Sequence, residues 1–461
     1  MREAAATVAR LAAAFEEIGV DEGARIAVIG ANSPWHYIVH VATSWLRAVT
    51  VPLSPRMPSP ALTSMCEQVG VSWVFLDEAS SRTHAPALSD ASAQVASFAD
   101  LSAWADRAAP IGHPPARCGT ELAAILFTSG STGIPRPVEL THEVMWWGST
   151  NFREGFDYAP TSSVVGVCAP TSHIGGFNGT SMDTWTHGGT LVTLGFPGSF
   201  DARGVIDAIE RYGITMMFAV PAIVRAILDE HERGGGDLSS WVRPLIGGDA
   251  MTADLTDAMR TVGLSPIHVW GMTETSGAGT VATPDSGAPA GSLGVPFPYV
   301  DLRLMATDER EAGVGELGEI WVRGPGVVSG DEWLRTGDLA TKDEDGWLHM
   351  VGRAHRMINT GGELVAPPTV ERALRSLDEV SDALVVGLPD ERWGQIVAAL
   401  IVPSPEGRAQ ASSMSTEALS EALSDTLAPW EKVRRVLIVD TLPTTTTGKP
   451  DSVAAARLFD A

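Results

Sequence analysis

The chain has 461 residues, a formal net charge of −24 and 44% hydrophobic residues. This length and composition predict a globular protein with room for more than one domain. The acidic charge argues against nucleic acid or an anionic membrane as a partner, because both attract basic surfaces.

Three cysteines, Cys66, Cys118 and Cys168, are too far apart in the sequence to indicate a metal knuckle or a redox pair. We therefore expect buried or idle thiols in a reducing cytosol, and we expect a cytoplasmic location. No apolar run approaches the roughly 18 residues of a membrane span, so we expect no membrane segment.

Helix and strand signals alternate along the first part of the chain. Apolar residues at helical spacing predict an amphipathic helix over 1–20, and a second helix is expected over 36–49. Buried strands are expected at 24–33, 71–78, 188–195 and 214–221, and from 121 up to a glycine-rich loop that begins at Thr128. This alternation predicts an α/β protein with helices packed on largely parallel sheets.

From about Val300 the pattern becomes strand-rich, with turns between the strands. After Gly352 the chain alternates helix and strand signals again, which predicts a small α+β domain. The expected strands are 300–305, 318–324, 346–353, 382–389, 396–403 and 434–440, and the expected helices are 369–377 and 418–427. We place the domain boundary near 352–356, which gives domains 1–352 and 353–461.

The loop from Thr128 to Gly133, TSGSTG, follows a strand and is rich in glycine and hydroxyl side chains. Such a loop offers backbone N–H groups and side-chain donors that can hold phosphate. Alone it is weak evidence, because many loops of small residues bind nothing. It is also not the common phosphate loop of NTPases, since no Lys-Ser or Lys-Thr pair follows it.

Further motifs make the loop informative. They are HIGG at 173–176, GGDA at 247–250, WGMTE at 270–274, RTGDL at 335–339, GR at 352–353, TGGELVAP at 360–367 and TTTTGKPD at 444–451. Together with TSGSTGIPRPVELTH at 128–142, they resemble the adenylate-forming superfamily of acyl-CoA synthetases, peptide-synthetase adenylation domains and firefly luciferase. The resemblance covers nearly the whole chain and is specific, because every motif stands in the family order.

The resemblance implies a large N-terminal domain that binds AMP and the acyl group, and a small mobile C-terminal lid. It implies a two-step acyl-CoA ligase that uses ATP, Mg²⁺ and CoA. A carboxylate attacks the α-phosphate of ATP, which gives acyl-AMP and pyrophosphate. The lid then rotates about a hinge near His355, and the thiol of CoA attacks the mixed anhydride.

The same resemblance assigns the nucleotide-binding residues. Asp338 would accept hydrogen bonds from both ribose hydroxyls, and Arg353 would assist with its fixed fork of donors. Trp270 would stack on adenine, with a core tryptophan as the alternative. Thr273 would donate to the α-phosphate, and Glu274 would hold Mg²⁺, which prefers carboxylate oxygen. The remaining expected contacts are Thr128, Ser129, Gly130, Ser131, Thr132, Gly133, Arg136, Gly248, Asp249, Ala250, Gly271 and Met272.

The HIGG motif indicates the acid. His173 would flank the reacting carboxylate, and Phe177, Ala219 and Met272 would line the acyl pocket. The segment HIGGFNG has no aspartate that could bind an α-amino group. We therefore expect a carboxylic acid without an α-ammonium group.

Two motifs belong to the C-terminal domain. Lys449 matches the lysine that bridges the carboxylate and the α-phosphate, where a cation stabilises developing negative charge; the alternative is a solvated lysine. Gly361 and Gly362 would leave room for the pantetheine arm of CoA; the alternative is a simple turn.

The phosphate loop departs from the family pattern at Arg136 and Pro137, where the family has lysine and glycine. Arginine keeps the charge but changes reach and geometry, and proline removes an N–H donor and fixes its own φ. These two changes would weaken the contacts of the loop with the departing pyrophosphate. Acyl-AMP does not contain pyrophosphate, so its binding need not be affected. We therefore expect CoA thioesterification to be better preserved than adenylation, and a separate ligase could then supply the acyl-AMP.

Three alternatives stay open. The chain could be a fully competent two-step synthetase, an enzyme that transfers the acyl group to a carrier protein or an amine, or a pseudo-enzyme that only binds nucleotide. The presence of Asp338, Arg353, Glu274 and Lys449 argues against the last, because a pure binder does not need Lys449.

Overall fold

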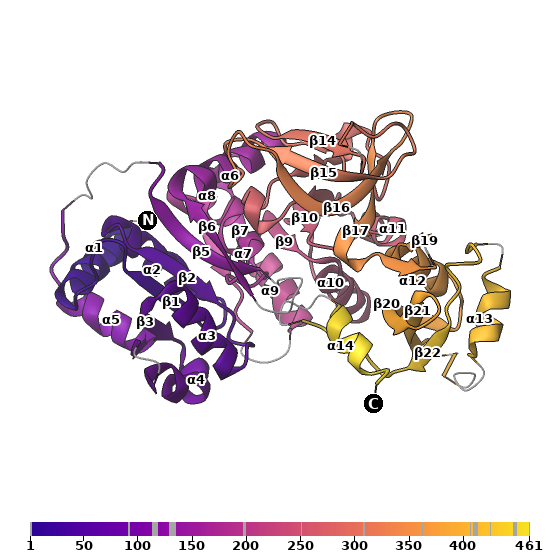
Figure 1. Ribbon diagram of the computed structural model, residues 1–461. Coiled ribbons are helices and arrows are strands. Elements are labelled where there is room, and N and C mark those ends of the chain that lie inside the picture. The colour runs from indigo at the N-terminus through magenta and orange to yellow at the C-terminus, as the bar shows by residue number, and fades with distance from the viewer. Residues whose placement is uncertain are drawn as a thin grey trace. The chain divides into compact units, whose positions relative to one another are not determined.

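The computed structural model describes most of the chain, and Figure 1 traces its elements in order. Spatial contacts divide the chain into two compact units, Met1–Leu302 with Val322–Leu334, and Arg303–Trp321 with Arg335–Ala461. The described residues are 2–90, 93–112, 119–128, 135–196, 200–249, 251–307, 309–361, 363–405, 407–408, 414–424, 426–445 and 450–460, without the side chains of residues 2 and 355.

The first unit begins with a six-stranded sheet in the order β4-β3-β1-β2-β5-β6. All neighbours are parallel except β6, which pairs antiparallel with β5 at the sheet edge. The strands are β1 Arg25–Ile29, β2 Val49–Leu53, β3 Val71–Leu76, β4 Gln94–Ser97, β5 Leu122–Thr128 and β6 Arg136–Thr141.

Helices cover both faces of this sheet, and each face has its own hydrophobic cluster. Residues of α1 Arg2–Glu17, α2 Pro34–Trp45 and α5 Phe98–Arg107 form one cluster with β1 and β3. Residues of α3 Ser59–Val69 and α4 Glu78–Asp90 form the other. Burial of apolar residues on both faces explains the continuous hydrophobic runs in the strands.

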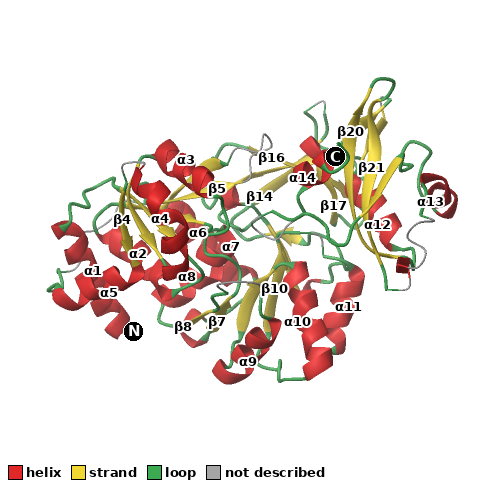
Figure 2. Ribbon diagram, turned by 90° about the horizontal axis from the view of Figure 1, so that it is seen from below, coloured by secondary structure: helices red, strands yellow, loops and turns green. Residues whose placement is uncertain are grey.

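A seven-stranded sheet follows in the order β13-β12-β11-β10-β9-β7-β8. Figure 2 labels its strands β7, β8 and β10. The central strands run parallel, and β12 and β13 are antiparallel. The strands are β7 Val164–Val167, β8 Thr190–Thr193, β9 Met216–Ala219, β10 Arg243–Gly247, β11 Ile267–Trp270, β12 Thr280–Ala282 and β13 Val295–Pro296. The helices are α6 His142–Gly155, α7 Ile174–Phe177, α8 Gly179–Thr186, α9 Ala202–Tyr212, α10 Pro221–Gly234 and α11 Ala253–Thr261, with 3₁₀ turns at Pro160–Ser162, Thr273–Thr275 and Pro284–Ser286.

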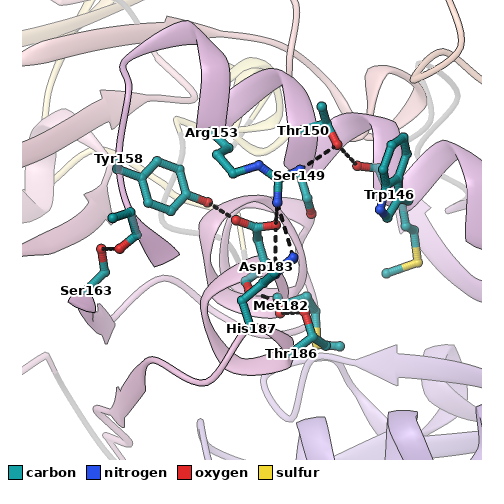
Figure 3. Close-up of polar contacts among 12 residues, drawn as sticks. Trp146, Ser149, Thr150, Arg153, Tyr158, Ser163, Met182, Asp183, Thr186 and His187 are labelled. Atoms are coloured by element: carbon teal, nitrogen blue, oxygen red, sulfur yellow. Dashed lines mark hydrogen bonds and ion pairs between the residues drawn. The ribbon is translucent and has the colours of Figure 1, made fainter. Parts of the chain in front are cut away.

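A buried polar network connects α6 to α8 (Figure 3). The carboxylate of Asp183, which is 4% exposed, accepts hydrogen bonds from Arg153 Nη1 at 3.0 Å and from the Tyr158 hydroxyl at 2.7 Å. Arg153 Nη2 also donates to Thr150 Oγ1 at 3.0 Å. Burial raises the pKa of Tyr158, so its hydroxyl stays a donor to Asp183. The network fixes α8, the helix that follows the HIGG motif.

The second unit contains most of two further sheets. One has the order β14-β15-β16-β17, and the other has the order β19-β18-β21-β20 with β22 paired in parallel to β21. The strands are β14 Asp301–Met305, β15 Gly318–Arg323, β16 Leu334–Lys342, β17 Leu348–Arg353, β18 Ile358–Thr360, β19 Glu363–Val365, β20 Val380–Asp390, β21 Gly394–Pro403 and β22 Arg435–Ile438. The helices are α12 Pro367–Arg375, α13 Thr416–Ala422 and α14 Ser452–Arg457, with a 3₁₀ turn at Ala354–Arg356.

The predicted α/β class, with largely parallel sheets, a strand-rich segment and a small α+β segment near the C-terminus, is confirmed. The compact units are defined by contacts alone, whereas the boundary predicted near 352–356 was placed at an expected hinge. That boundary stays a prediction. Among the residues that the structure describes, no helix has the length and apolar content needed to cross a membrane.

Candidate active site

Two of the predicted nucleotide motifs begin at the ends of neighbouring strands. Gly248 and Asp249 follow β10 and are exposed, and Trp270 is the last residue of β11. The two strands are parallel, with Gly247 opposite Val269. Parallel strands end at the same sheet edge, so the GGDA and WGMTE motifs lie side by side, where open α/β sheets usually bind ligands.

The WGMTE turn is held tightly. A Cβ on Gly271 would lie 2.2 Å from the carbonyl oxygen of Gly277, so only glycine fits there. Thr275 Oγ1 accepts from the N–H of Met272 at 3.1 Å, and the N–H of Val328 donates to the carbonyl of Glu274 at 2.9 Å. These bonds fix the backbone from which Thr273 and Glu274 project.

Trp270 is 8% exposed, and its ring lies 2.4 Å from where a Cβ of Gly279 would stand. The six-membered ring of the indole therefore packs closely against the backbone at Gly279. Adenine stacking would require an accessible face of the indole, so the predicted role of Trp270 stays a prediction beside the core alternative.

The HIGG segment, 173–176, is packed so closely that its glycines are required. A Cβ on Gly175 would lie 2.6 Å from the ring of Phe218, and one on Gly176 would lie 2.5 Å from the carbonyl oxygens of Ala169 and Pro170. His173 caps the N-terminus of α7 and is partly exposed. The glycines thus allow His173 to sit on a short helix pressed against neighbouring backbone.

Residues near β1 also support this segment. The side chain of Asn32 donates to the carbonyls of Val167 and Ala169, at 3.0 and 2.9 Å, and accepts from the N–H of Thr171 at 3.0 Å. The hydroxyl of Tyr37, in α2, donates to the carbonyl of Gly176 at 2.5 Å. Both contacts join parts of the chain more than a hundred residues apart, and no sequence motif indicated them.

Two of the predicted acyl-pocket residues are fully buried. Phe177 and Ala219 are each 0% exposed and belong to hydrophobic clusters, whereas Met272 is partly exposed. Their role in a pocket stays a prediction. Phe218, which the sequence reasoning missed, is the partly exposed side chain of β9, and its ring also lies 3.2 Å from a Cβ built on Gly247.

Asp338 and Arg353 lie opposite each other in β16 and β17 of the second unit. Arg353 Nε is 2.8 Å from Asp338 Oδ1, and the Asp338 side chain is 4% exposed while that of Arg353 is 46% exposed. The structure thus brings together the two residues predicted to bind the ribose. Their contact is a charge-assisted pair with the carboxylate on the buried side.

The rest of RTGDL holds Asp338 in place. The N–H of Asp338 donates to Thr336 Oγ1 at 3.1 Å, and Thr336 donates to the carbonyl of Ile320 at 2.7 Å. The N–H of Gly337 donates to Glu319 Oε1 at 3.0 Å, and Arg335 Nη2 donates to Glu319 Oε2 at 2.8 Å. These hydrogen bonds therefore hold the backbone at Asp338 in place.

Gly361 lies in the turn between β18 and β19, with φ of 67°. Its N–H donates to the carbonyl of Trp393 at 2.8 Å, and a Cβ there would lie 2.6 Å from the Trp393 ring. The guanidinium groups of Arg392 and Arg434 lie 4.8 and 5.0 Å from the centre of the same ring. The missing side chain of Gly361 leaves room for Trp393, and the CoA role of the glycine stays a prediction.

The phosphate loop begins and ends in a β-hairpin. Thr128, at the end of β5, lies opposite Arg136, at the start of β6, and Phe127 lies opposite Pro137. Proline is tolerated here because β6 is an edge strand. The extended conformation of Arg136 agrees with the restriction that a following proline imposes.

Some predicted residues lie outside the described part of the chain. They are Ser129, Gly130, Ser131, Thr132, Gly133, Ala250, Gly362 and Lys449, together with the side chain of His355. The backbone of His355 belongs to the 3₁₀ turn Ala354–Arg356, at the predicted hinge.

Within the described residues, no group of three or more His, Cys, Asp or Glu side chains is arranged to hold a metal ion. Glu274 nevertheless offers a carboxylate, the hard oxygen donor that Mg²⁺ prefers. Mg²⁺ in nucleotide sites is commonly held by one or two carboxylates and by substrate phosphates. This carboxylate therefore fits Mg²⁺ that arrives with ATP.

Two of the three cysteines, Cys66 and Cys168, are buried, as expected, and Cys118 lies outside the described residues. Burial raises the pKa of Cys66 and of Cys168 to about 12, so both stay protonated near neutral pH. A protonated, buried thiol is a poor nucleophile. Neither cysteine is therefore part of the candidate chemistry.

Comparison with known proteins identifies the family. Residues 1–330 match the model of the AMP-binding enzyme family, and residues 369–449 match the AMP-binding enzyme C-terminal domain. Feruloyl-CoA synthase of an Amycolatopsis species is 32% identical over 459 residues, which cover 96% of this chain and 90% of that protein. Indoleacetate–CoA ligase of Aromatoleum aromaticum is 29% identical over 469 residues, with the same coverage of 96% and 90%.

Among solved structures, ATP-bound MatB from Rhodopseudomonas palustris superposes with a TM-score of 0.86 at 24% identity, covering 99% of this chain and 93% of that one. This likeness concerns the fold alone. The chain therefore belongs to the adenylate-forming family of AMP-binding enzymes, in its acyl-CoA synthetase branch.

Proposed function

We propose that this enzyme is an acid–thiol ligase that joins a carboxylic acid without an α-ammonium group to CoA through an acyl-adenylate. The observation that carries the proposal is the pair of Asp338 and Arg353, 2.8 Å apart at the two motif positions that the family uses for ribose. The related CoA ligases support the same chemistry.

In the first step, an oxygen of the acid would attack the α-phosphorus of ATP, and pyrophosphate would leave with the electrons of the broken P–O bond. Thr273 would donate to the α-phosphate, and Lys449 would offset the charge that develops there. Mg²⁺, when bound at Glu274 with ATP, would supply positive charge beside the phosphates. His173 would orient the carboxylate.

In the second step, the sulfur of CoA would attack the acyl carbon, and AMP would leave as the C–O bond to phosphate breaks. The thiol proton is lost to solvent or to the leaving phosphate. Asp338 and Arg353 would hold the ribose in both steps. Gly361 would then lie near the arm of CoA.

We propose an aromatic carboxylic acid as the substrate class. Phe218 supports this, because its partly exposed ring lies against Gly175 of the HIGG motif and beside Gly247. An aromatic side chain favours an aromatic ligand through stacked or edge-to-face contact. Two relatives carry the names of aromatic acids, ferulate and indoleacetate.

We further propose that thioester formation is faster than adenylation. Arg136 and Pro137 begin β6 and pair with Thr128 and Phe127, so both ends of the phosphate loop are held in a hairpin. Proline also lacks the N–H and the freedom that glycine would give a loop closing on pyrophosphate. A ligase with a slow first step would depend on acyl-AMP made by another ligase.

The substrate experiment is a panel of ferulate, indoleacetate, decanoate and phenylalanine, each with CoA. Every acid is supplied with ATP and, in a parallel reaction, as its preformed acyl-AMP, and thioester is measured by mass spectrometry. We expect thioester from ferulate and indoleacetate and none from phenylalanine, whose α-ammonium lacks a carboxylate partner in HIGGFNG. Absence of thioester from every acid in both forms would contradict the proposed function.

The loop experiment restores the family residues with Arg136→Lys and Pro137→Gly together. Pyrophosphate release from the best acid with ATP should rise at least about fivefold, while thioester formation from acyl-AMP should change less than about twofold. No rise in pyrophosphate release would mean that the loop tolerates its proline, and that the enzyme is an ordinary two-step synthetase.

A further inference from the structure

Asn178 lies at the junction of α7 and α8, directly after the HIGG segment, and is 1% exposed. Its backbone serves both helices, since its N–H donates to the carbonyl of Ile174 at 3.0 Å and its carbonyl accepts from the N–H of Ser181 at 2.9 Å. Its side chain makes no capping bond to α8. The buried amide is therefore used for contacts outside this segment.

The amide reaches two segments that carry other motifs. Nδ2 donates to the carbonyl of Met145, in α6, at 3.0 Å and to Oγ of Ser276 at 2.9 Å. Oδ1 accepts a longer bond of 3.4 Å from Ser149, also in α6. The helix α6 directly follows β6 and so follows the phosphate loop, and Ser276 directly follows the WGMTE turn. The side chain of Asn178 thus connects the HIGG segment with the helix that follows the phosphate loop and with the residue that follows the WGMTE turn.

The junction requires a close approach. A Cβ on Gly148 would lie 2.5 Å from both Cβ and Oγ of Ser276, so α6 can reach this turn only with glycine at that position. Ser276 is 0% exposed and has φ of 52°, a left-handed conformation that is uncommon outside glycine. A residue keeps such a conformation only where surrounding contacts hold it there, and residues of this kind cluster at functional sites. Asn178 makes one of those contacts.

We infer that Asn178 is a positioning residue that keeps the acyl-binding segment in register with the segments that bind the nucleotide. The inference rests on the proposed function, in which the acid and the nucleotide react with each other. Reaction requires the two groups at close distance and correct angle, and a misplacement of about 1 Å can cost about a hundredfold in rate. Asn178 acts through the segments it joins, and it is not a catalytic residue.

This role makes a specific demand on binding. Loss of the amide would leave the contacts that each separate ligand makes, so AMP alone and acid alone should bind nearly as before. A linked acyl-adenylate gains its affinity by engaging both segments at once, which requires that their spacing matches the ligand. The linked ligand should therefore lose affinity when register is lost.

Calorimetry with three probes tests the inference. The probes are AMP, ferulate and 5′-O-(N-feruloylsulfamoyl)adenosine, a non-hydrolysable acyl-adenylate; if the panel favours another acid, that acid and its sulfamoyl adenosine are used. For Asn178→Ala we expect at least a tenfold loss of affinity for the linked probe and less than a threefold loss for each separate one. Single-turnover acyl-AMP formation should fall by a similar factor.

Asn151→Ala is the matched control. Asn151 is a buried amide in α6, 0% exposed, and its Oδ1 accepts from the N–H of Tyr299 at 2.9 Å, a residue outside the HIGG segment. Both asparagine variants should lower the melting temperature, but only Asn178→Ala should weaken the linked probe selectively. Ser276→Ala, which removes a single acceptor of the amide, should shift the linked probe in the same direction by a smaller factor.

Three outcomes would overturn the inference. If Asn178→Ala loses the same factor of affinity for all three probes, the substitution has damaged the protein in general. If Asn178→Ala and Asn151→Ala lose the same factor of affinity for the linked probe, the amide of Asn178 has a purely structural role. Should Asn178→Ala not fold, an unchanged linked affinity in Ser276→Ala would have the same meaning. Wild-type protein that binds AMP but no linked probe contradicts the proposed function itself, and the role of Asn178 falls with it.

Discussion

Asp338 is a buried carboxylate whose position is set before any ligand arrives. Arg353 neutralises it at 2.8 Å, and the Thr336 hydroxyl accepts from its N–H at 3.1 Å. A buried carboxylate needs such partners, because an unpaired buried charge is costly. Preformed contacts of this kind reduce the ordering cost of binding, so a ribose would meet acceptors that are already in place.

Asp338→Ala tests this assignment. The carboxylate would accept two charge-assisted bonds, each worth roughly 1.5–3 kcal/mol, and about 1.4 kcal/mol is a tenfold change in affinity. AMP should therefore bind at least about tenfold more weakly by calorimetry. Asp301→Ala, which removes an exposed partner of Arg323 at 2.9 Å, is the control and should change AMP affinity less than twofold. Unaltered affinity in Asp338→Ala would refute the ribose role.

Phe218 is the second residue whose role can be tested alone. Phe218→Ala would remove the ring that lies against Gly175 and should raise the KM for ferulate at least about fivefold, with AMP affinity unchanged. Phe196→Ala is the control, because Phe196 is also partly exposed and packs on Phe200, 5.1 Å away between ring centres. A KM for ferulate that is the same in both variants would place Phe218 outside the acyl pocket.

At the scale of elements, α2 shows how a helix supports a site that its own sequence does not reveal. Ser33 caps its N-terminus by accepting from the N–H of Trp35, and Pro34 follows at the first helical position. Tyr37 and His40 then lie on one face, three residues apart. Tyr37 bonds to Gly176, and the His40 ring lies 4.8 Å from the Phe177 ring. The helix thus buttresses the HIGG segment.

Burial of two histidines in α2 predicts acid sensitivity. Burial lowers the pKa of His36 to about 4 and that of His40 to about 3, against an ordinary value of 6.5. Between these values and pH 6.5 the unfolded chain binds protons that the folded chain does not. The contribution of these two histidines to the free energy of unfolding is thus constant above about pH 6.5. It falls as the pH is lowered, by about 1.4 kcal/mol per pH unit and per histidine.

Denaturant titrations at pH 7.5, 6.0 and 5.0 check this sign. His40 Nδ1 lies 3.0 Å from Thr50 Oγ1, within hydrogen-bond distance. His40→Gln should be less stable at pH 7.5, since it disturbs this contact, but its stability should decline less steeply towards pH 5.0. Parallel declines in the wild type and the variant would contradict the assignment of buried, neutral His40.

Helices and strands were predicted correctly where the hydrophobic pattern of a segment and its length indicated the same kind of element. The strand ending at Thr128 and the strand ending in Gly352-Arg353 were predicted from their sequences and are observed as β5 and β17. The predicted helix over 36–49 instead ends at Trp45, because β2 starts at Val49 after a turn without proline or glycine. Local sequence carried no sign of that break.

The residues of the candidate site could be predicted from the sequence only where they belong to a recognised motif. The pairing of Asp338 with Arg353 agrees with the predicted ribose roles. The contacts of Asn178 with Ser276, 98 positions apart, and of Tyr37 with Gly176, 139 positions apart, arise from tertiary packing. Phe218 escaped prediction because β9 is buried at its other positions, so alternation did not single it out.

At the scale of the whole molecule, we predict that the C-terminal domain takes a different arrangement in each half-reaction, with His355 as the hinge. Proline would fix φ and remove the N–H there. His355→Pro should slow one half-reaction at least tenfold and change the other less than threefold. His355→Ala is the control and should alter neither, since a hinge depends on backbone rotation. If the proline variant leaves the rates of both half-reactions as they are in the wild type, domain rotation is contradicted.

The measurement that tests the central claim most directly compares both half-reactions in one preparation of the unmodified enzyme. Single-turnover rates are measured for feruloyl-AMP with CoA, and for ferulate with ATP and Mg²⁺, alongside ATP–pyrophosphate exchange. We predict rapid feruloyl-CoA formation from the preformed adenylate, and acyl-AMP formation and exchange at least about tenfold slower. Exchange as fast as thioester formation would contradict the claim and would identify a two-step synthetase whose phosphate loop works with Arg136 and Pro137.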